Sequence, residues 1–388
     1  MADKSPIEWT DATWNPIVGC SILSPGCTRC YAMRMAARIE AMGGAKHYAG
    51  TTKKVNGNAV WTGRLALAPE RILLEPLRWQ RPRRIFVNSM GDLFHEDVPD
   101  EWIDRVFAVM ALAPQHTFQV LTKRAKRMRE YMNERWQPAP AHRMAWPGGD
   151  VIDIPAETTG EDREDQVRAA CEPFLEKLGL VDTDNDDLWT EDGNAKAMTW
   201  TWPLSNVWLG VSAERQQEAD ERIPELLATP AAIRFVSAEP LLGPIDFTSI
   251  CTGHYFIDAL RGFKYHDAPE GVHSATEQCA KLDQVIVGGE SGHDARPMHP
   301  QWPRWIRNDC ASAGAAFFFK QWGAWAPATD GSREIARVLP DGRVREWETG
   351  EGRLVHLDMV AMSRLGKKAA GRMLDGIEHN AMPEAEFS

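Results

Sequence analysis

The sequence lacks any apolar run long enough to cross a bilayer, and its amino terminus lacks the basic-then-apolar pattern of a signal peptide. These absences predict a soluble, cytoplasmic protein with no membrane partner. An excess of positive charge is also missing, since 44 Lys and Arg residues face 55 Asp and Glu residues and give a formal net charge of -11. A surface that attracts nucleic acid broadly is therefore excluded, although a local basic groove is not.

The sequence of 388 residues contains only seven cysteines, which is an odd number. In a cytoplasmic chain this argues against a disulfide framework and favours free thiols or thiolates bound to a metal. Tryptophan, in contrast, is abundant, with 16 residues. We interpret the tryptophans as parts of an aromatic core more readily than as platforms for stacked bases.

Short apolar runs recur along the chain and end in polar or glycine-rich residues. They lie at 14–19, 84–89, 117–122, 207–212, 233–237, 284–287 and 316–319. Runs rich in Val, Ile and Phe are typical of parallel strands buried on both faces. Helical patterns separate several of them, one starting at Pro99-Asp100 and one spanning Trp302 to Ala313, where Gly314 is placed to end it. The pattern predicts an α/β fold, either barrel-like or doubly wound.

Chemically useful side chains follow these runs. The carboxyl ends of barrel strands are where functional groups gather. The residues predicted to lie there are Cys20, Asp92, Lys123, Glu214, Glu239, Glu290 and Lys320. Their recurrence after seven runs favours a full or partial TIM-like (β/α) barrel.

Two segments break the strand–helix alternation. Residues 137–202, with an acidic stretch at 182–187, and the polar residues 248–282 are predicted insertions into a barrel-like domain at 1–326. After Pro327 the pattern predicts a hairpin that turns at Asp341-Gly342, followed by a helical tail. Residues 327–388 would thus form a small C-terminal extension.

Three cysteines, Cys20, Cys27 and Cys30, have the spacing C-x6-C-x2-C. Two thiolates separated by two residues can bind one metal centre, and the turn at Pro25-Gly26 brings Cys27 back towards Cys20. Three protein ligands leave one position open to a substrate. The alternatives are structural zinc, with His47 or Cys310 as a fourth ligand, and cysteines without a metal.

The cysteine loop resembles the cluster loop of radical S-adenosylmethionine enzymes, in which three cysteines after the first barrel strand hold a 4Fe–4S cluster. The place of the loop, the neighbouring Tyr31 and the strand series match, whereas the first gap is wider than the usual C-x3-C-x2-C. The resemblance implies that Cys20, Cys27 and Cys30 hold a cluster whose fourth iron binds the amino and carboxylate groups of S-adenosylmethionine.

Apart from the two predicted insertions, the chain also resembles a phage and prophage family of unknown function, sometimes called the three-Cys-motif family. The matching segments lie at 8–10, 13–16, 19–20, 25–27, 30–32, 92–95, 121–124, 237–244, 288–292, 320–323 and 366–372. This resemblance fixes no reaction. Its phage context favours nucleic-acid modification or repair.

Other polar groups are candidates for binding a cofactor. Gly288, Gly289 and Glu290 follow a predicted strand, so their amides and carboxylate can hold a charged ligand, or form a tight turn. Ser212, Glu214 and Glu239 lie at neighbouring strand ends, where the carboxylates can bind ribose hydroxyls or an amine, or act as acid–base groups. Capping of the following helices is the structural alternative.

Lys123 and Arg124 suit a carboxylate or a phosphate ligand, and Asp92 with His95 suits proton transfer. We expect Asp92, Lys123 and Glu239 to be catalytic. Lys320 and Gln321 end the last strand and are expected to line the same site. Lys367, Lys368 and Arg372 in the tail can cover the site or touch phosphate, or belong to a solvated terminus.

The leading hypothesis is a radical S-adenosylmethionine-like iron–sulfur enzyme, whose substrate is unknown and is expected to be a nucleic acid or a nucleotide. The first alternative is a non-catalytic nucleic-acid- or protein-binding module with a structural metal, for which zinc is the candidate. The second is a barrel hydrolase that uses carboxylates and has incidental cysteines. A protein partner that presents the substrate is compatible with the first hypothesis.

Overall fold

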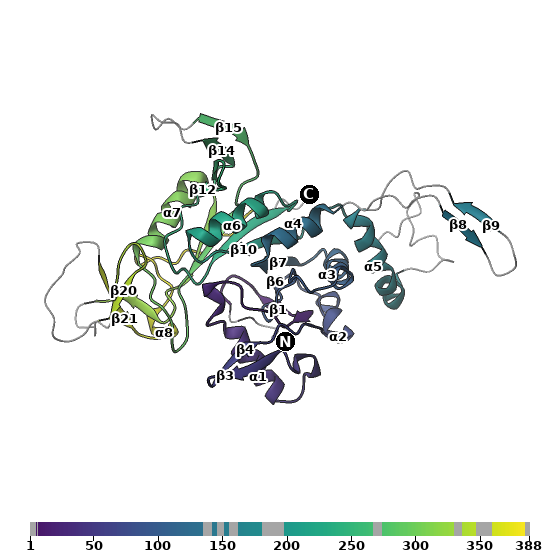
Figure 1. The fold of residues 1–388 in the computed structure, drawn as a ribbon, viewed down its shortest axis with the longest axis horizontal. Helices are drawn as coiled ribbons and strands as arrows, with labels where there is room; N and C mark the ends of the chain where they lie inside the picture. Colours follow the sequence, from purple (N-terminus) through teal and green to yellow (C-terminus); the bar gives the residue numbers. More distant parts are fainter. Residues whose placement is uncertain are drawn as a thin grey trace.

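The structure is a computed structural model that describes residues 5, 7–134, 142–145, 151–154, 162–180, 198–266, 274–329, 336–346 and 359–384. These residues form a mixed α/β fold with a curled, seven-stranded parallel sheet (Figure 1). About half of the predicted insertion at 137–202 lies outside the described residues, and its described part includes a helix at Arg163–Leu178 whose apolar side chains belong to the main core. Among the described residues, no helix combines the length and the apolar character needed to span a membrane.

The strands of the main sheet follow one another in the order in which they occur along the chain. They are β1 (Ala12–Trp14), β6 (Arg84–Val87), β7 (Thr117–Thr122), β10 (Val207–Ser212), β11 (Ile233–Ala238), β16 (Gln284–Gly288) and β17 (Ala316–Gln321). All neighbouring pairs are parallel. This confirms the predicted parallel sheet. Closure into a full barrel is not confirmed, since β1 and β17 are the two edges of the sheet in the described part of the chain.

The first strand lies earlier than predicted. The expected strand at 14–19 is replaced by β1, which ends at Trp14, and by β2 (Ile17–Val18), which pairs with β5 (Ala66–Leu67) instead. Pro16 between them has no N–H to donate to a strand ladder. The side chain of Asn15 accepts a hydrogen bond from the backbone of Met90 at 2.9 Å, so the chain leaves the sheet at this point.

The two faces of the sheet bury different side chains because residues alternate along each strand. In β10, Val207, Leu209 and Val211 belong to the main core, which also includes residues of the outer helices. Between them, Trp208 belongs to a separate aromatic cluster on the opposite, concave face. The buried members of this cluster are Trp9, Phe86, Trp208, Phe235, Ile286 and Phe318.

Among the described residues, five helices cover the convex face of the sheet. They are α3 (Asp100–Ala111), α4 (Ala125–Asn133), α5 (Arg163–Leu178), α6 (Gln216–Leu227) and α7 (Gln301–Ala313). The predicted helix after Pro99 is present as α3, and acidic residues occupy its first turn, where they complement the helix dipole. The predicted helix at 302–313 is present as α7, which ends at Gly314 with a φ of 73°.

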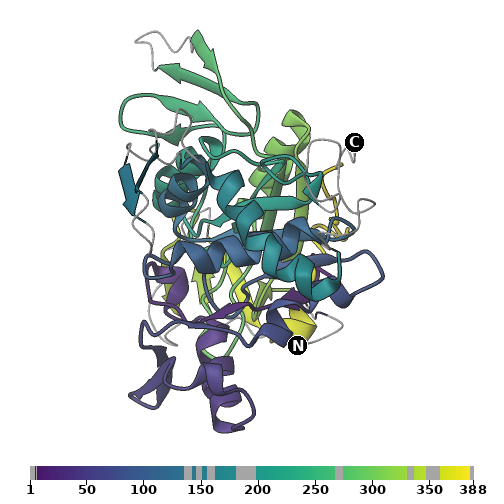
Figure 2. The ribbon, with the colours of Figure 1, turned by 90° about the vertical axis from the view of Figure 1, so that its right-hand side faces the viewer.

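A small lobe at the amino-terminal end of the chain follows the cysteine loop. It holds α1 (Tyr31–Ala41), the 3-10 turn η2 (Lys46–Tyr48) and the hairpin of β3 (Thr52–Val55) and β4 (Asn58–Trp61). It projects from the body of the molecule (Figures 1 and 2). Met33, Tyr48 and Trp61 form its core, and Cys20 and Cys30 pack against that core.

The remaining elements are peripheral to the main sheet. The short helical elements are η1 (Pro25–Cys27), α2 (Glu70–Leu73), η3 (Pro76–Arg78) and α8 (Lys367–Ala370). One antiparallel sheet contains β12 (Ile250–Cys251), β13 (Phe256–Asp258), β14 (Phe263–His266) and β15 (Ser274–Gln278). Another contains β18 (Trp325–Pro327), β21 (Val360–Arg364), β19 (Ala336–Val338) and β20 (Val344–Glu346), and β8 (His142–Ala145) pairs with β9 (Val151–Ile154).

Candidate functional site

A cavity of about 390 Å³ lies at the carboxyl ends of the parallel strands. This is the edge at which ligands bind in parallel α/β folds. Of the residues predicted to be functional, the cavity is lined by Cys20, Cys27, Cys30, Asp92, Lys123, Arg124, Ser212, Glu239, Gly289, Glu290, Lys320, Gln321 and Lys367. Glu214 and Gly288 lie beside this lining. The structure therefore brings the residues from separate parts of the sequence to one place.

The three cysteines come from one compact loop. The 3-10 turn η1 is closed by hydrogen bonds from the amide of Cys27 to the carbonyl of Ser24 at 2.9 Å and from Cys30 to Cys27 at 3.2 Å. Cys27 is buried, and Cys20 and Cys30 are half-buried. Neither His47 nor Cys310, considered above as a fourth zinc ligand, is among the residues that line this cavity.

The thiols are held in a poorly solvated place. Burial and, to a smaller extent, the neighbouring carboxylate of Asp92 raise the pKa of Cys20 to about 12, although Arg124 acts against this rise. Burial likewise raises the pKa of Cys30. Cys20 and Cys30 are therefore protonated at neutral pH unless a bound cation stabilises their thiolates. Among the described residues, no three His, Cys, Asp or Glu side chains are arranged as ligands of a single metal ion.

Glu214, at the carboxyl end of β10, ties the cysteine loop to the sheet. Its carboxylate accepts hydrogen bonds from the hydroxyl of Ser24 at 2.7 Å and from Nη1 of Arg222 at 3.1 Å, and it pairs with Lys123. Burial alone would raise the pKa of Glu214, but Lys123 and Arg222 outweigh burial and hold the pKa below its ordinary value. A side chain on Gly26 would meet this carboxylate, since a Cβ there would lie 2.2 Å from Oε1.

Asp92 and Arg124 form a second set of contacts that holds the cysteine loop. Arg124 donates to Asp92 at 3.0 Å and to the hydroxyl of Ser21 at 2.7 Å, and its Nη1 lies 3.8 Å from the sulfur of Cys20. Asp92 also accepts from the hydroxyl of Thr122 at 2.6 Å and from backbone amides. The oxygens of Asp92 are thus occupied by bonds that fix the loop.

His95 does not form a proton-transfer pair with Asp92 in this structure. Its Nε2 lies 2.8 Å from the hydroxyl of Ser21, and its Nδ1 accepts from the amide of Asp97 at 3.2 Å. Burial lowers the pKa of His95, and Arg124 lowers it further. A neutral His95 that supports the cysteine loop through Ser21 is consistent with these contacts.

Glu290, which follows β16, provides a third set of contacts that holds the cysteine loop. It accepts hydrogen bonds from Arg296 at 2.6 Å and 2.9 Å and from Arg29, next to Cys30, at 3.2 Å. Arg296 also donates to the carbonyl of Pro25 at 3.1 Å. Burial would raise the pKa of Glu290, but the bonds from Arg296 outweigh this and lower it. This carboxylate is ionised and acts within the protein as an anchor.

Glu239, Lys320 and Gln321 face the cavity and contribute less than the residues above to holding the cysteine loop. Lys320 donates to one oxygen of Glu239 at 2.7 Å, and Gln321 donates to the other at 3.1 Å. The Glu239 side chain keeps 18% of its surface exposed and Lys320 keeps 13%. Gly288 makes room for this carboxylate, because a Cβ there would lie 3.1 Å from it.

Gly289 allows a close approach between two backbone segments. A Cβ at this position would lie 2.0 Å from the carbonyl oxygen of Trp322, and its amide donates to the carbonyl of Gln321 at 2.9 Å. Both glycines therefore have a packing role, and cofactor binding by their amides stays a prediction. Of the Gly-Gly-Glu motif, only Gly289 and Glu290 reach the cavity lining.

Several residues of the site were missed from the sequence. Ser24, Arg222 and Arg296 hold the loop only through contacts between distant segments. Asn88 lines the cavity and adopts the left-handed conformation, with a φ of 59°. Trp9 lines it from the amino-terminal segment. Asn88 could have been found as a polar residue at the end of a predicted strand. No comparable signal in the sequence marked the other residues.

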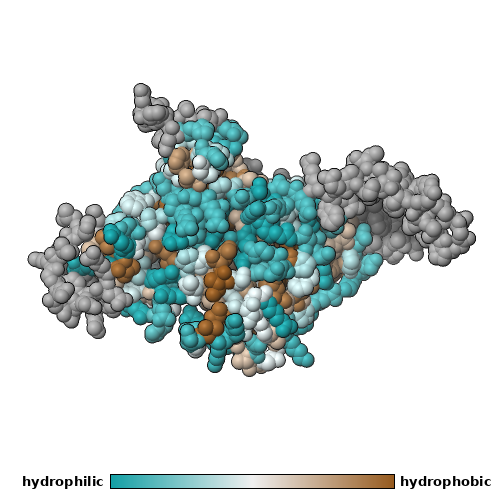
Figure 3. Space-filling view, in the orientation of Figure 1, coloured by the Kyte–Doolittle hydropathy of each residue, from teal (hydrophilic) through white to brown (hydrophobic). Residues whose placement is uncertain are grey.

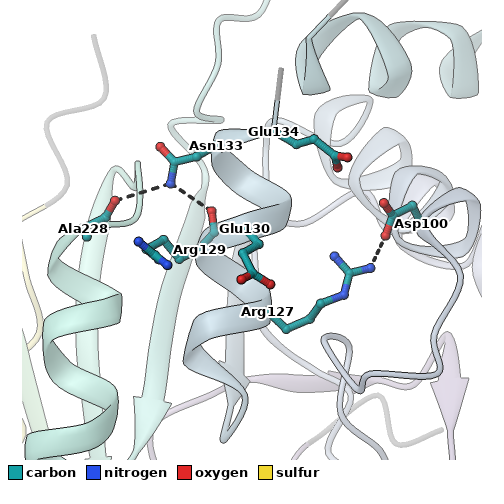
Figure 4. Close-up of a pocket in the computed structure, with 7 residues that line it drawn as sticks. All are labelled: Asp100, Arg127, Arg129, Glu130, Asn133, Glu134 and Ala228. Atoms are coloured by element: carbon teal, nitrogen blue, oxygen red, sulfur yellow. Dashed lines mark hydrogen bonds and ion pairs between the residues drawn. The ribbon is translucent and has the colours of Figure 1, made fainter. Parts of the chain in front are cut away.

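A second hollow, of about 670 Å³, lies between α3, α4 and the end of α6 (Figure 4). Arg127 points across it to Asp100, and the amide of Asn133 donates to the carbonyls of Arg129 and Ala228. None of the predicted functional residues lines it. Its charged side chains all have ion-pair partners in the described part of the chain, so the cysteine-lined cavity is the candidate site.

Comparison with known proteins gives a family and nothing further. A family model described as "Protein of unknown function (DUF5131)" matches residues 4–383. No curated protein matches the chain, and no solved structure does.

Proposed function

The chain belongs to the DUF5131 family of proteins of unknown function, and we propose that it is an iron–sulfur enzyme of the radical S-adenosylmethionine type. One observation carries the proposal. Three thiols from a single loop line a cavity at the carboxyl ends of a curled parallel sheet, and groups on three different strand ends hold that loop in place.

The donor set fits a 4Fe–4S cluster. Cys20, Cys27 and Cys30 would hold it, and a cluster with three protein thiolates keeps one iron available to another ligand. The charge of the cluster irons would offset the burial that keeps the thiols of Cys20 and Cys30 protonated in the free protein. When bound and reduced, such a cluster supplies the electron that cleaves S-adenosylmethionine, and the radical produced abstracts hydrogen from a substrate.

The protein's own side chains divide into two groups under this proposal. Asp92, Glu214 and Glu290 are positioning residues, because their oxygens are committed to the cysteine loop and its supports. Lys123 and Glu239 line the cavity and are the candidates for direct contact with bound molecules. Lys123 suits a carboxylate, and Glu239 suits an ammonium group or ribose hydroxyls.

Glu239 is also the best placed group for a proton transfer. It faces the cavity, and Lys320 donates to its Oε2 at 2.7 Å, so a proton can move between this pair and a bound substrate. The aromatic side chains of Trp9, Tyr31 and Phe86 line the same space. The resemblance to phage and prophage proteins favours nucleic-acid modification or repair as the setting.

The proposal is tested by anaerobic purification and reconstitution with iron and sulfide, followed by measurement of methionine released from S-adenosylmethionine under reducing conditions. We expect release by the wild type and by Cys251→Ala, a control at an exposed cysteine outside the site. Cys20→Ala, Cys27→Ala and Cys30→Ala should each abolish it. Stoichiometric zinc without sulfide, and no methionine release, would instead support the non-catalytic metal-stabilised binding module.

A further inference from the structure

The lobe that follows the cysteine loop is basic although the protein as a whole is acidic. Residues 29–69, called the basic lobe below, hold seven Lys and Arg residues and a single acidic residue, Glu40. The cations are Arg29, Arg34, Arg38, Lys46, Lys53, Lys54 and Arg64. Such a local excess in a chain of net charge -11 marks a surface for a polyanion.

The charge of the basic lobe is exposed and uncompensated. All seven cations are exposed. Only Arg29 has a carboxylate partner among the described residues, Glu290 at 3.2 Å. The carboxylate of Glu40 accepts from the amide of Gly50 at 2.7 Å. The buried arginines Arg124, Arg163 and Arg222, in contrast, are all paired with carboxylates.

The basic lobe forms one wall of the cysteine-lined cavity. Arg29, Tyr31 and Trp61 belong to the cavity lining as well as to the lobe. Arg34 lies against Gly292, where a Cβ would come within 2.9 Å of its guanidinium. In Figure 3 the lobe lies at the lower edge of the molecule, where hydrophilic and apolar residues are mixed. A polyanion held on the lobe would therefore reach the mouth of the cavity.

The cavity also carries buried polar groups without partners. Oδ1 of Asn88 accepts from the amide of Ile17 at 3.2 Å, which fixes the orientation of the side-chain amide. Its Nδ2 is buried and has no partner among the described residues, and only 2% of the residue is exposed. Oε1 of Gln321, a buried acceptor in the same lining, is also unpartnered within the described chain. Buried polar groups are normally paired, so the donor of Asn88 and the acceptor of Gln321 are the groups of the lining that a ligand with an acceptor and a donor would satisfy.

Aromatic side chains complete a site for a planar ring. Trp9, Tyr31, Trp61 and Phe86 all line the cavity. A nucleobase has π faces that stack on aromatic rings and an edge with donors and acceptors. A base within a duplex cannot reach such a cavity without being extruded, whereas an unpaired base can.

We propose that the basic lobe binds the backbone of a single-stranded nucleic acid and that the strand places one unstacked base in the cavity, near Asn88 and Gln321. Phosphates would contact the exposed cations of the lobe, which gives affinity without sequence preference. Strand binding is independent of the proposed function, and only a reaction on the bound base would rest on it. The binding itself does not require the cluster to be active.

The test measures binding of fluorescent single strands of DNA and RNA of about 20 nucleotides, by anisotropy, over about 50 to 300 mM KCl. The full chain is used, and iron is measured on the same samples. The charge reversals K53E/K54E and R34E/R38E are compared with R81E/K281E. Arg81 and Lys281 are exposed cations before strands β6 and β16, at the opposite end of the sheet from the cavity.

We expect each lobe variant to bind at least about tenfold more weakly and to flatten the slope of log K against log salt by about 0.7 for each phosphate that the variant no longer neutralises. The R81E/K281E control should bind like the wild type. Asn88→Asp should weaken binding about tenfold with the salt slope unchanged, because it removes a base contact and no phosphate contact. Duplexes of the same sequence should bind less tightly than single strands.

The inference is overturned if the wild type binds no strand at the lowest salt, if the lobe variants bind as well as the wild type, or if oligoglutamate binds equally well. Strand binding by a protein that holds no iron would keep this inference and remove the proposed enzyme. Iron, sulfide and methionine release without strand binding would do the reverse.

Discussion

Replacing Glu214 with glutamine removes one negative charge from a fully buried position that three partners share. The carboxylate has no solvent exposure, and neither oxygen is free, because Ser24, Lys123 and Arg222 all donate to it. Lys123 is partly exposed and can turn towards the cavity, but the Arg222 side chain is only 2% exposed and would be left facing a neutral amide. The substitution therefore leaves a buried charge without compensation.

Removing one partner of a buried ion pair costs about 3–5 kcal/mol. An unfolding entropy of about 2 cal/mol/K per residue gives about 0.8 kcal/mol/K for a chain of 388 residues. The melting temperature of Glu214→Gln should thus fall by about 4 to 6 °C. The lowered pKa of Glu214 keeps the carboxylate ionised at pH 7, so the loss is complete there.

Thermal unfolding at pH 7, followed by circular dichroism, measures the effect. The matched control is Glu130→Gln on α4, whose side chain is 52% exposed and lies 3.9 Å from Lys126, where the cost should stay below about 1 kcal/mol. Because Ser24 loses a charged acceptor, Glu214→Gln should also retain less iron after reconstitution. If Glu214→Gln had the same melting temperature as the control and the same iron content as the wild type, the assignment of Glu214 as the anchor of the cysteine loop would be refuted.

Three other substitutions test further contacts of the structure. Gly26→Ala should lower iron retention because its Cβ would collide with the carboxylate of Glu214, whereas Gly44→Ala, with nothing within 4 Å, should behave like the wild type; equal iron content in both would contradict this. Glu239→Gln should keep the iron but lose methionine release, and retained release would exclude Glu239 from binding S-adenosylmethionine. Hydrogen bonds from two arginines of α7 lower the pKa of Asp375 to about 2, below its ordinary value of 3.8. The stability lost in Asp375→Asn should therefore be greatest above pH 3.8 and should shrink as the pH falls towards about 2, which unfolding at several pH values would show; a constant difference would refute it.

Much of the sheet was predictable because local patterns encode it. The apolar runs at 117–122 and 207–212 coincide with β7 and β10, and their polar ends do gather at one edge of the sheet. The first strand was misplaced because the apolar run continues past Pro16, where the missing N–H ends the pairing. Closure of the barrel was not predictable, since it depends on how the two edge strands are placed in space.

The sequence predicted which residues lie at the site better than it predicted what each residue does there. The sequence showed the carboxylates of Glu214 and Glu290, but their commitment to Arg222 and Arg296 depends on tertiary contacts that no local pattern encodes. The cations of the basic lobe were visible as residues, but their exposure and lack of partners were not. Net charge alone concealed them because acidic residues elsewhere outweigh them.

The central claim is that Cys20, Cys27 and Cys30 hold a cluster that binds S-adenosylmethionine. It is tested most directly by the electron-spin resonance spectrum of the anaerobically reduced protein, with and without S-adenosylmethionine. A 4Fe–4S signal that shifts on addition of S-adenosylmethionine, and that is missing from each Cys→Ala variant but present in Cys251→Ala, is the result predicted. Stoichiometric zinc, or no metal after reconstitution, would contradict the claim.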